Sequence, residues 1–209
     1  MSGEVLQSFF ESVTGQVTTV SVIFLLLVLV MRTNEKKNDV SVLVKTAILV
    51  AVTFVLNHIT LIRMPQGGSV TAFSMFTIFL VSYLFGPRQG ILAGMAYGLI
   101  DLVLNPYVIH PMQIFLDYPL AFGAIGLGGL LRNNKNGIFT GYLVGVLGRY
   151  LVVVLSGIIF WGEYAAEGFN AVTWSFFYNM TYMLPEAIAT VAILMIPQVR
   201  NLFDRFKMK

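Results

Sequence analysis

The side chains best suited to bind or transfer a proton lie in residues 110–129, HPMQIFLDYPLAFGAIGLGG. Asp117 stands in a stretch that is otherwise apolar, and a charged side chain at the centre of an inserted helix costs about 2.5–3.5 kcal/mol. In helical spacing His110, Gln113 and Asp117 share one face, with small residues further along the same face. Pro119 frees the carbonyl four residues back, beside the carboxylate. We therefore expect Asp117 to face protein, water or a ligand.

The composition indicates whether this chain folds in water or in a membrane. Of its 209 residues 57% are hydrophobic and 11% are charged, with a mean hydropathy of +0.80, whereas roughly 25% of the residues of soluble domains are charged. The chain is an integral membrane protein whose surroundings are the lipid bilayer. It has no cysteine, which excludes disulfides and thiolate metal sites. Its basic residues cluster in loops and not among exposed aromatics, so we expect no nucleic-acid partner.

The apolar runs predict an all-α membrane protein with seven spans. Run 17–31 reads as a retained anchor helix, and the polar segment RTNEKKND after it is the clearest boundary in the chain. We expect residues 1–41 to form an anchor helix and basic linker, and residues 42–209 a transmembrane domain of six helices. The six runs are approximately 42–62, 71–85, 90–104, 111–131, 137–160 and 171–196. Most are long enough for a core of about 30 Å, although the second and third are short.

The distribution of basic residues predicts the orientation, because loops on the cytoplasmic side carry an excess of lysine and arginine. With the linker inside, only Arg63 falls outside and Arg149 lies within the membrane. The basic residues that fall inside are Arg32, Lys36, Lys37, Lys45, Arg88, Arg132, Lys135, Arg200, Arg205, Lys207 and Lys209. The N-terminus is then outside and the C-terminus inside, and the outer loops are 63–70, 105–110 and 161–170.

Counting residues from the outer surface places two polar side chains at similar depth. Asp117 lies roughly 9 Å and Asn179 roughly 12 Å below the start of its helix, at about 1.5 Å per residue. The aromatic residues expected around that level are Tyr107, Tyr118, Trp161, Trp174 and Tyr178. A carboxylate, an amide and an aromatic wall predict an outward-facing pocket for a small organic cation with hydrogen-bonding edges. The alternative for the tryptophans is an aromatic belt at the membrane interface.

The loop MPQGGSVT, residues 64–71, is expected to close over this pocket. Its two adjacent glycines allow the backbone to approach a ligand closely or to hinge. We expect Gln66, Gly67, Gly68 and Ser69 to contact the ligand. The alternative is an ordinary glycine-rich turn between membrane helices.

The remaining buried polar residues receive structural interpretations. Arg149 and Glu186 lie near mid-membrane on the last two helices, and we expect them to pair with each other. Asp101, near the outer end of its helix, is expected to reach water. His58 and His110 have no histidine partner one turn away, which argues against a metal site.

Four separated segments together resemble a known family. They are MPQGGSVT, HPMQIFLDYPLAFGAIGLGG, RYLVVVLSGIIFWGEYAAEG and WSFFYNMTYMLPE, in this order. The chain from about residue 42 to 197 resembles the ThiT family, the thiamine-specific substrate-binding (S) components of energy-coupling factor (ECF) transporters. The resemblance implies a six-helix fold and a thiamine site near the outer face. It also implies a shared ECF module, made of one transmembrane coupling protein and two ATPases, in a prokaryotic plasma membrane.

The resemblance further implies roles for individual residues. The ligand contacts it implies are Gln113, Asp117 and Tyr118 on the fourth core helix, Tyr107 in the preceding loop, Tyr150 and Trp161 on the fifth helix and at its outer end, and Trp174 and Asn179 on the sixth. Ala47 and Ala51, four residues apart on the first core helix, would pack on the coupling protein. Two departures concern ligand preference: Val153 stands where some relatives have histidine, and Asp117 where some have glutamate. The N-terminal helix is also outside the six-helix pattern.

The leading hypothesis is a vitamin-binding transport subunit that is no enzyme and has no cofactor, thiamine being the transported ligand. The chain has no GxxxxGK[ST] phosphate loop, so partner subunits must hydrolyse ATP if transport is energised. One alternative is an S component for a thiamine precursor or another heterocyclic vitamin. An intramembrane enzyme is disfavoured because HExxH and GxSxG are absent. A purely structural membrane protein would show no saturable binding of a small molecule.

Overall fold

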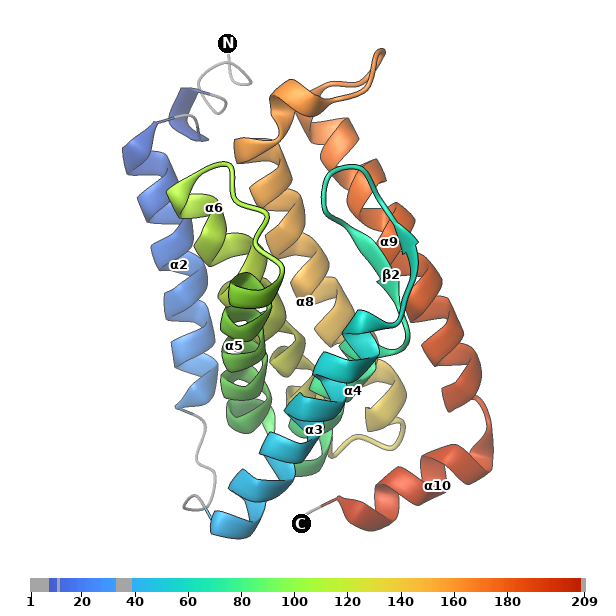
Figure 1. Ribbon diagram of the computed structural model, residues 1–209. Helices are drawn as coiled ribbons and strands as arrows, with labels where there is room; N and C mark the ends of the chain where they lie inside the picture. The colour runs from blue at the N-terminus through green and yellow to red at the C-terminus, as the bar shows by residue number, and fades with distance from the viewer. Residues whose placement is uncertain (1–7, 11, 33–38, 208–209) are drawn as a thin grey trace.

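The structure, a computed structural model, describes residues 8–10, 12–32 and 39–207. Helices form an elongated bundle, and a short β-hairpin packs against one side of it (Figure 1). Most of the predicted linker, residues 33–38 with Lys36 and Lys37, and the C-terminal Lys209 lie outside the described residues. The proposed boundary between residues 41 and 42 therefore stays a prediction.

The helices occupy the predicted apolar runs. The elements are α2 (Val13–Met31), α3 (Val40–His58), β1 (Thr60–Arg63), β2 (Ser69–Thr71), α4 (Ser74–Phe85), α5 (Pro87–Leu104), α6 (Pro111–Phe115), η1 (Leu116–Leu120), α7 (Ala121–Ala124), η2 (Ile125–Leu131), α8 (Gly137–Phe160), η3 (Gly162–Tyr164), α9 (Ala171–Leu194) and α10 (Pro197–Phe206). The prediction of an all-α, multi-pass membrane protein is confirmed.

The count of seven spans stays a prediction. Among the described residues, α2, α3, the run from α6 to η2, and α8 are long and apolar enough to cross a membrane, and the bent pair α9–α10 would be a fifth span. Helix α4 has only 12 residues, which cover roughly 18 Å. Almost all of α4 is buried among its neighbours, so this segment does not need to span the bilayer by itself.

The first core helix is shorter than predicted. It ends at His58 and not near residue 62, because residues 60–71 form an antiparallel hairpin in which Ile62 pairs with Val70. A segment as short as these four residues, with two apolar side chains, does not by itself distinguish a strand from the end of a helix. The turn that closes the hairpin contains Gly67 at φ +85°, a conformation that favours glycine.

The segment 111–131 was predicted as one helix and is instead broken into four pieces. Its second piece, η1, is a π-helical turn that contains Pro119. In a π turn each amide donates to the carbonyl five residues back, as Ala121 N–H does to Leu116. The missing proline amide therefore shifts the hydrogen-bond register and does not end the helix. Asp117 and Tyr118 lie in this irregular turn.

Close packing holds the broken segment in place from two sides. On α5, a Cβ at Gly94 would lie 2.2 Å from the carbonyl oxygen of Phe122, and one at Gly98 would lie 2.5 Å from that of Tyr118. Only glycine permits this approach of α5. On the other side α2 packs against α5, α6 and η1, and its Leu27 is buried in the core of the bundle.

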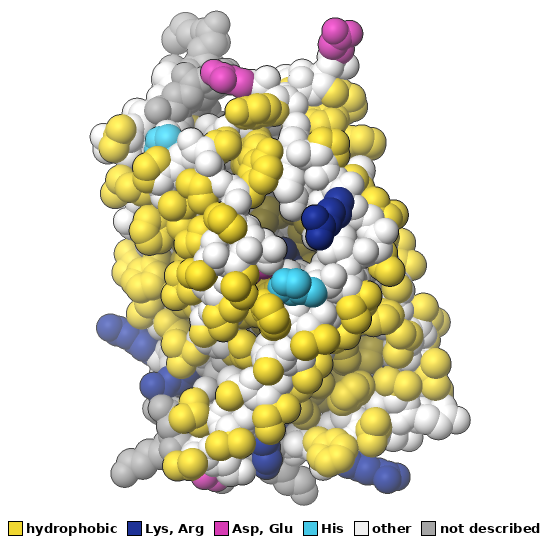
Figure 2. Space-filling view, viewed as in Figure 1, with side chains coloured by type: hydrophobic (Ala, Val, Ile, Leu, Met, Phe, Trp, Pro, Cys, Tyr) yellow, Lys and Arg dark blue, Asp and Glu magenta, His cyan; other side chains and the backbone are white. Residues whose placement is uncertain are grey.

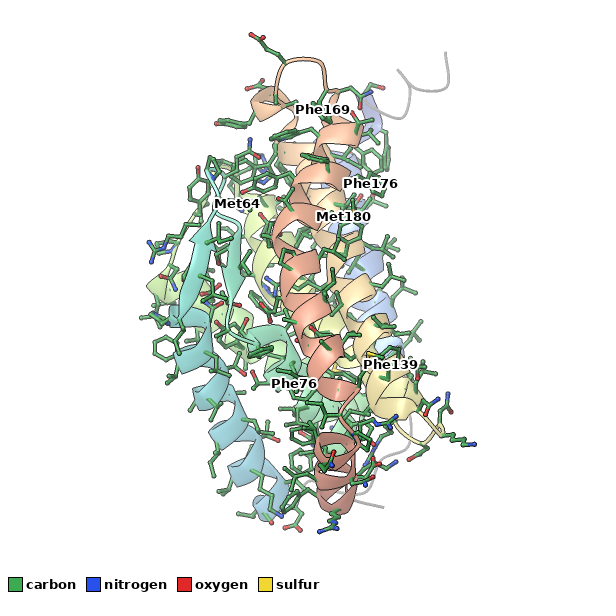
Figure 3. All side chains as sticks on the ribbon, turned by 90° about the vertical axis from the view of Figure 1, so that its right-hand side faces the viewer. Met64, Phe76, Phe139, Phe169, Phe176 and Met180 are labelled. Carbon is green, nitrogen blue, oxygen red and sulfur yellow. The ribbon has the colours of Figure 1, made fainter. Side chains whose placement is uncertain are left out.

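The last predicted helix, 171–196, ends at Leu194, and α10 follows at an angle of 88° to α9. Pro197 starts α10 at a position where its missing amide costs no hydrogen bond. The helix crosses the end of the bundle that lies far from the hairpin (Figure 1). Its Phe203 packs edge-on against Phe76 of α4, with ring centroids 5.4 Å apart; Figure 3 shows Phe76 directly above α10.

Candidate functional site

A cavity of about 390 Å³ lies between the β-hairpin, α3, α5, η1, α8 and α9. It appears as a hollow on the face seen in Figure 2, with basic and histidine side chains at its rim. The cavity brings together these residues that the sequence predicts as ligand contacts: Gln66, Gly67, Gly68, Ser69, Tyr107, Gln113, Asp117, Tyr118, Trp161, Trp174 and Asn179. Residues separated by more than 100 positions along the chain thus meet around one space.

Tyr150 is the predicted ligand contact that does not line this cavity. Its hydroxyl donates to the carbonyl oxygen of Phe176 at 2.9 Å, and the two rings meet edge to face. On α8 the residues that do line the cavity are Arg149, Val153 and Gly157, which are spaced four apart. Tyr150 is rotated about 100° from Arg149 on the same helix and therefore faces α9.

The side chain of Gln113 holds Asp117 in the cavity wall. The Nε2 atom of Gln113, one turn earlier, donates to Oδ2 of Asp117. The same amide nitrogen donates to the carbonyl oxygen of Tyr107 at 3.1 Å, and Gln113 Oε1 accepts from the amide of Ile109 at 3.2 Å. Because Gln113 is only 1% exposed and bonded at both ends, it fixes the direction of the carboxylate. The Asp117 side chain itself remains partly accessible from the cavity.

Aromatic rings form two walls of the cavity. Tyr107 and Trp161 are stacked, with centroids 5.4 Å apart and an interplanar angle of 26°. On α9, Trp174 and Tyr178 lie 5.8 Å apart, and Tyr178 and Tyr182 are also 5.8 Å apart. Such faces attract a flat heterocycle, and they attract a cation still more strongly.

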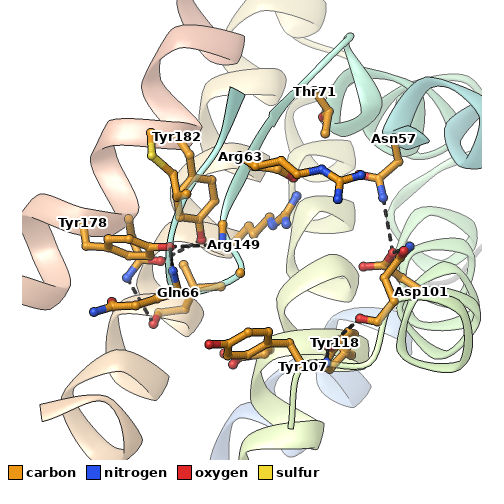
Figure 4. A pocket seen from close by; sticks show the side chains of 18 of the residues that line it. Asn57, Arg63, Gln66, Thr71, Asp101, Tyr107, Tyr118, Arg149, Tyr178 and Tyr182 are labelled. Atoms are coloured by element: carbon orange, nitrogen blue, oxygen red, sulfur yellow. Dashed lines mark hydrogen bonds between the residues drawn. The ribbon is translucent and has the colours of Figure 1, made fainter. Parts of the chain in front are cut away.

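The tip of the hairpin is fastened to α9 at the mouth of the cavity. The hydroxyl of Tyr178 accepts from the backbone amides of Gln66 and Gly68, both at 3.1 Å. The Gln66 side chain accepts from Trp174 Nε1 at 3.2 Å and donates to the carbonyl oxygen of Tyr164 at 2.8 Å. Figure 4 shows Gln66 lying against Tyr178. These contacts make the 64–69 tip a cover over the α9 side of the cavity.

Asn179 serves the packing of α8 and α9 as well as lining the cavity. Its Nδ2 atom donates to the carbonyl oxygen of Ser175 at 2.9 Å, and its Oδ1 accepts from the hydroxyl of Tyr182 at 2.7 Å. Ser175 Oγ in turn donates to the carbonyl oxygen of Val154 on α8 at 2.8 Å. Any polar ligand edge that reaches Asn179 would join this existing network.

The predicted ion pair between Arg149 and Glu186 is wrong. Glu186 accepts from the amide of Met75 at 2.7 Å and from the hydroxyl of Thr71 at 2.6 Å. Helix α4 begins after Phe73, which has no side-chain cap, so a carboxylate from α9 supplies the missing acceptor at a positive helix end.

Arg149 has a different environment from the one that the sequence predicted. Its guanidinium lies 4.0 Å from the centroid of the Phe122 ring, a cation–π contact. Its Nε–H is buried and has no hydrogen-bond partner within the described part of the chain. Arg149 also lines the cavity, as Figure 4 shows, although the sequence indicated only a structural role.

A second carboxylate on the opposite wall was also not predicted as part of the site. Asp101 of α5 accepts from Asn57 of α3 at 3.2 Å and from Asn105 at 3.1 Å (Figure 4). Its sequence signal was the same as that of Asp117, an acid in an apolar run. Its position near a helix end suggested exposure to water, whereas α3 and the cavity enclose it.

The charges around the cavity favour a cation. Its lining contains three carboxyl groups and the two guanidinium groups of Arg63 and Arg149. If all are ionised, one negative charge is in excess. Among the described residues no group of three or more His, Asp or Glu side chains is placed to hold a metal ion.

The fold and this cavity together define a multi-pass membrane protein that binds a small organic ligand between its helices. The family model described as thiamine transporter protein (Thia_YuaJ) matches residues 43–203. The chain belongs to this family. Its relatives are transporters, and the chain accordingly is not an enzyme.

Relatives and a solved structure agree with this assignment. The thiamine transporter ThiT of Bacillus subtilis (strain 168) is 33% identical over 177 residues, which cover 77% of this chain and 91% of that protein. ThiT of Lacticaseibacillus paracasei is 26% identical over 180 residues, covering 76% and 87%. A structure of ThiT from Listeria monocytogenes aligns with a TM-score of 0.65 at 24% identity, over 78% of this chain and 97% of that one, which shows the shared fold. Helix α2 precedes the residues that the family model matches.

Proposed function

We propose that this chain is the thiamine-binding S component of an ECF-type importer. It would take thiamine into the cavity from the side on which the cavity opens, which the distribution of basic residues predicts to be the outer side. The observation that supports this most directly is Asp117, aimed by Gln113 into a cavity with stacked aromatic walls. A carboxylate kept in such a place at a cost of about 2.5–3.5 kcal/mol is explained by a cationic ligand.

The chemistry of thiamine is complementary to this cavity. Its aminopyrimidine edge presents a donor and an acceptor, which a carboxylate at Asp117 and the amide of Asn179 would complement. Its thiazolium ring is a cation that would lie against an aromatic face, for which Trp161 and Trp174 are available on two walls. The hairpin tip at 64–69 would cover the ligand once it is bound.

Fluorescence titration with thiamine tests the proposal. The chain has two tryptophans, and both line the cavity. We expect saturable quenching of the purified full-length protein by thiamine, and a smaller quench in Trp161→Phe and Trp174→Phe. Absence of any saturable change, with a calorimetric titration also silent, would contradict thiamine binding.

A second candidate ligand is a thiamine precursor such as hydroxymethylpyrimidine. It is favoured by Val153, which lines the cavity where some relatives have a hydrogen-bonding histidine and contributes only an apolar surface. Competition between thiamine and its pyrimidine half separates the two candidates. Thiamine as the true ligand requires the half to bind at least tenfold more weakly, since it lacks the cation. Equal affinities would instead assign the site to the precursor.

The proposed surface for binding the coupling protein is the side of α3 that faces away from the bundle. Ala47 and Ala51 lie one turn apart and are exposed there, and small exposed side chains allow another membrane helix to approach closely. We expect Ala47→Trp and Ala51→Trp to reduce association with the ECF module and ATP-driven uptake while thiamine binding persists. The matched control is Val103→Trp, at an exposed apolar position of α5. An equal loss in this control would refute the assignment of α3.

A further inference from the structure

Helix α10 has two uncovered sides of opposite character. Leu202 and Phe206 are 50% and 65% exposed and lie one turn apart, beside the face that packs on the bundle. Arg205 is exposed and points about 100° away from Phe206. An apolar strip next to an exposed basic side chain, on a helix at 88° to the preceding span, is the arrangement of helices that lie in a membrane interface.

The position of α10 is set by contacts with the bundle. Phe203 packs on Phe76, and the hydroxyl of Tyr83 donates to the carboxylate of Asp204. Lys207 Nζ donates to the carbonyl oxygen of Arg132 at 2.7 Å and lies 5.4 Å from the centroid of the Tyr83 ring. These contacts, at Phe203, Asp204 and Lys207, hold the helix across the end of the bundle. They also fix its rotation, so that Leu202, Arg205 and Phe206 face away from the bundle.

One guanidinium group on this helix, that of Arg205, is fully available for an anion, whereas Arg200 is partly buried and lies about 140° from Arg205 around the helix axis. Within the ranges that the structure describes, Arg205 makes no side-chain hydrogen bond or ion pair. The only acid on α10, Asp204, is engaged with Tyr83. No acid among the described residues therefore pairs with the charge of Arg205. In Figure 2 most of the basic side chains in view lie toward this end of the molecule.

We propose that α10 binds anionic phospholipid. The guanidinium group of Arg205 would bind the phosphate oxygens of a headgroup, which accept two parallel hydrogen bonds from arginine. Leu202 and Phe206 would lie against the first methylenes of the acyl chains. A phospholipid presents these two chemistries side by side, as the helix does. An acidic segment of a partner protein would satisfy the guanidinium group and would leave the apolar strip uncovered.

Lipid titration of the full-length protein in detergent, followed by native mass spectrometry, tests this proposal. We expect phosphatidylglycerol to bind more tightly than phosphatidylcholine with the same acyl chains. An arginine near a phosphate contributes roughly fivefold in affinity, so Arg205→Gln should weaken phosphatidylglycerol binding roughly fivefold and leave phosphatidylcholine binding unchanged. Leu202→Ser with Phe206→Ser should weaken both lipids alike.

The matched control is Lys135→Gln, which removes one exposed positive charge from the loop between η2 and α8. It should retain the preference for phosphatidylglycerol. Equal affinity for the two lipids, or an equal loss in the Lys135 variant, would overturn the proposal. So would unchanged lipid binding in the arginine variant together with weaker capture of the ECF module. Thiamine titration checks the fold of each variant, since the cavity lies at the other end of the bundle. If the wild-type protein does not bind thiamine, that result contradicts the proposed function and leaves the lipid proposal untouched.

Discussion

Replacing Asp117 by asparagine should weaken thiamine binding about 10- to 100-fold. The substitution keeps the shape of the side chain and an oxygen that can accept from Gln113 Nε2, so the local geometry persists. What is lost is the charge, and a hydrogen bond to a charged group contributes about 1.5–3 kcal/mol. Each 1.4 kcal/mol is tenfold in the dissociation constant, which gives the expected range. Tryptophan fluorescence titration measures it, because both tryptophans line the cavity.

The control for this experiment is Asp101→Asn, the same chemical change on the opposite wall. Asp101 is already bonded to Asn57 and Asn105 and lies next to α3. Both variants remove one negative charge from the cavity lining, so the long-range attraction of a cation falls in both. The difference between them isolates direct contact at Asp117. If Asp117→Asn binds thiamine within about twofold of the wild type, or if Asp101→Asn loses more, the assignment of Asp117 to the ligand is refuted.

Three further predictions concern the hairpin tip, the start of α4 and the packing of α2. Tyr178→Phe should speed thiamine release several-fold in stopped-flow measurements, because the hydroxyl that accepts two amides of the hairpin tip is lost; an unchanged rate would show that the tip closes by other contacts. Glu186→Gln should cost about 1.5–3 kcal/mol of stability and increase hydrogen exchange at residues 69–75, since the α4 cap loses its charge; native-like exchange there would contradict the capping role. Leu27→Ala should lower the thermal unfolding midpoint by the loss of about 2–5 kcal/mol of core packing, whereas Leu26→Ala on the exposed side should not.

The long helices were predictable because their signal is local and extends over many residues. Helix α8 covers residues 137–160 as predicted, since a long apolar run with one charged residue, Arg149, starts after the polar segment RNNKN. The hairpin and the π-helical turn were not predicted. Both depend on a few residues, and at that length apolar periodicity does not separate strand, α-helix and π-helix.

The candidate site was predictable only in part. Counting depth along each helix suggested that Asp117 and Asn179 approach one another, and both line the cavity. The family resemblance matches positions along the sequence and implied Tyr150, which faces α9 instead of the cavity. Its neighbour Arg149 was expected to pair with Glu186 and was therefore not predicted to line the cavity. Glu186 shows a further limit. Its carboxylate accepts from a backbone amide at the start of α4, more than 100 residues earlier in the chain. The sequence pattern of side chains does not show which backbone amides lack an acceptor.

The π-helical turn at 116–120 holds one residue more than an α-helical turn would. Because a complete turn of either kind returns to the same side of the helix axis, losing that residue would leave the parts before and after it facing the same directions. A residue lost from the regular part of α8 would instead rotate everything that follows it by about 100°. A missing codon for Pro119 should therefore be tolerated better than a missing codon in α8.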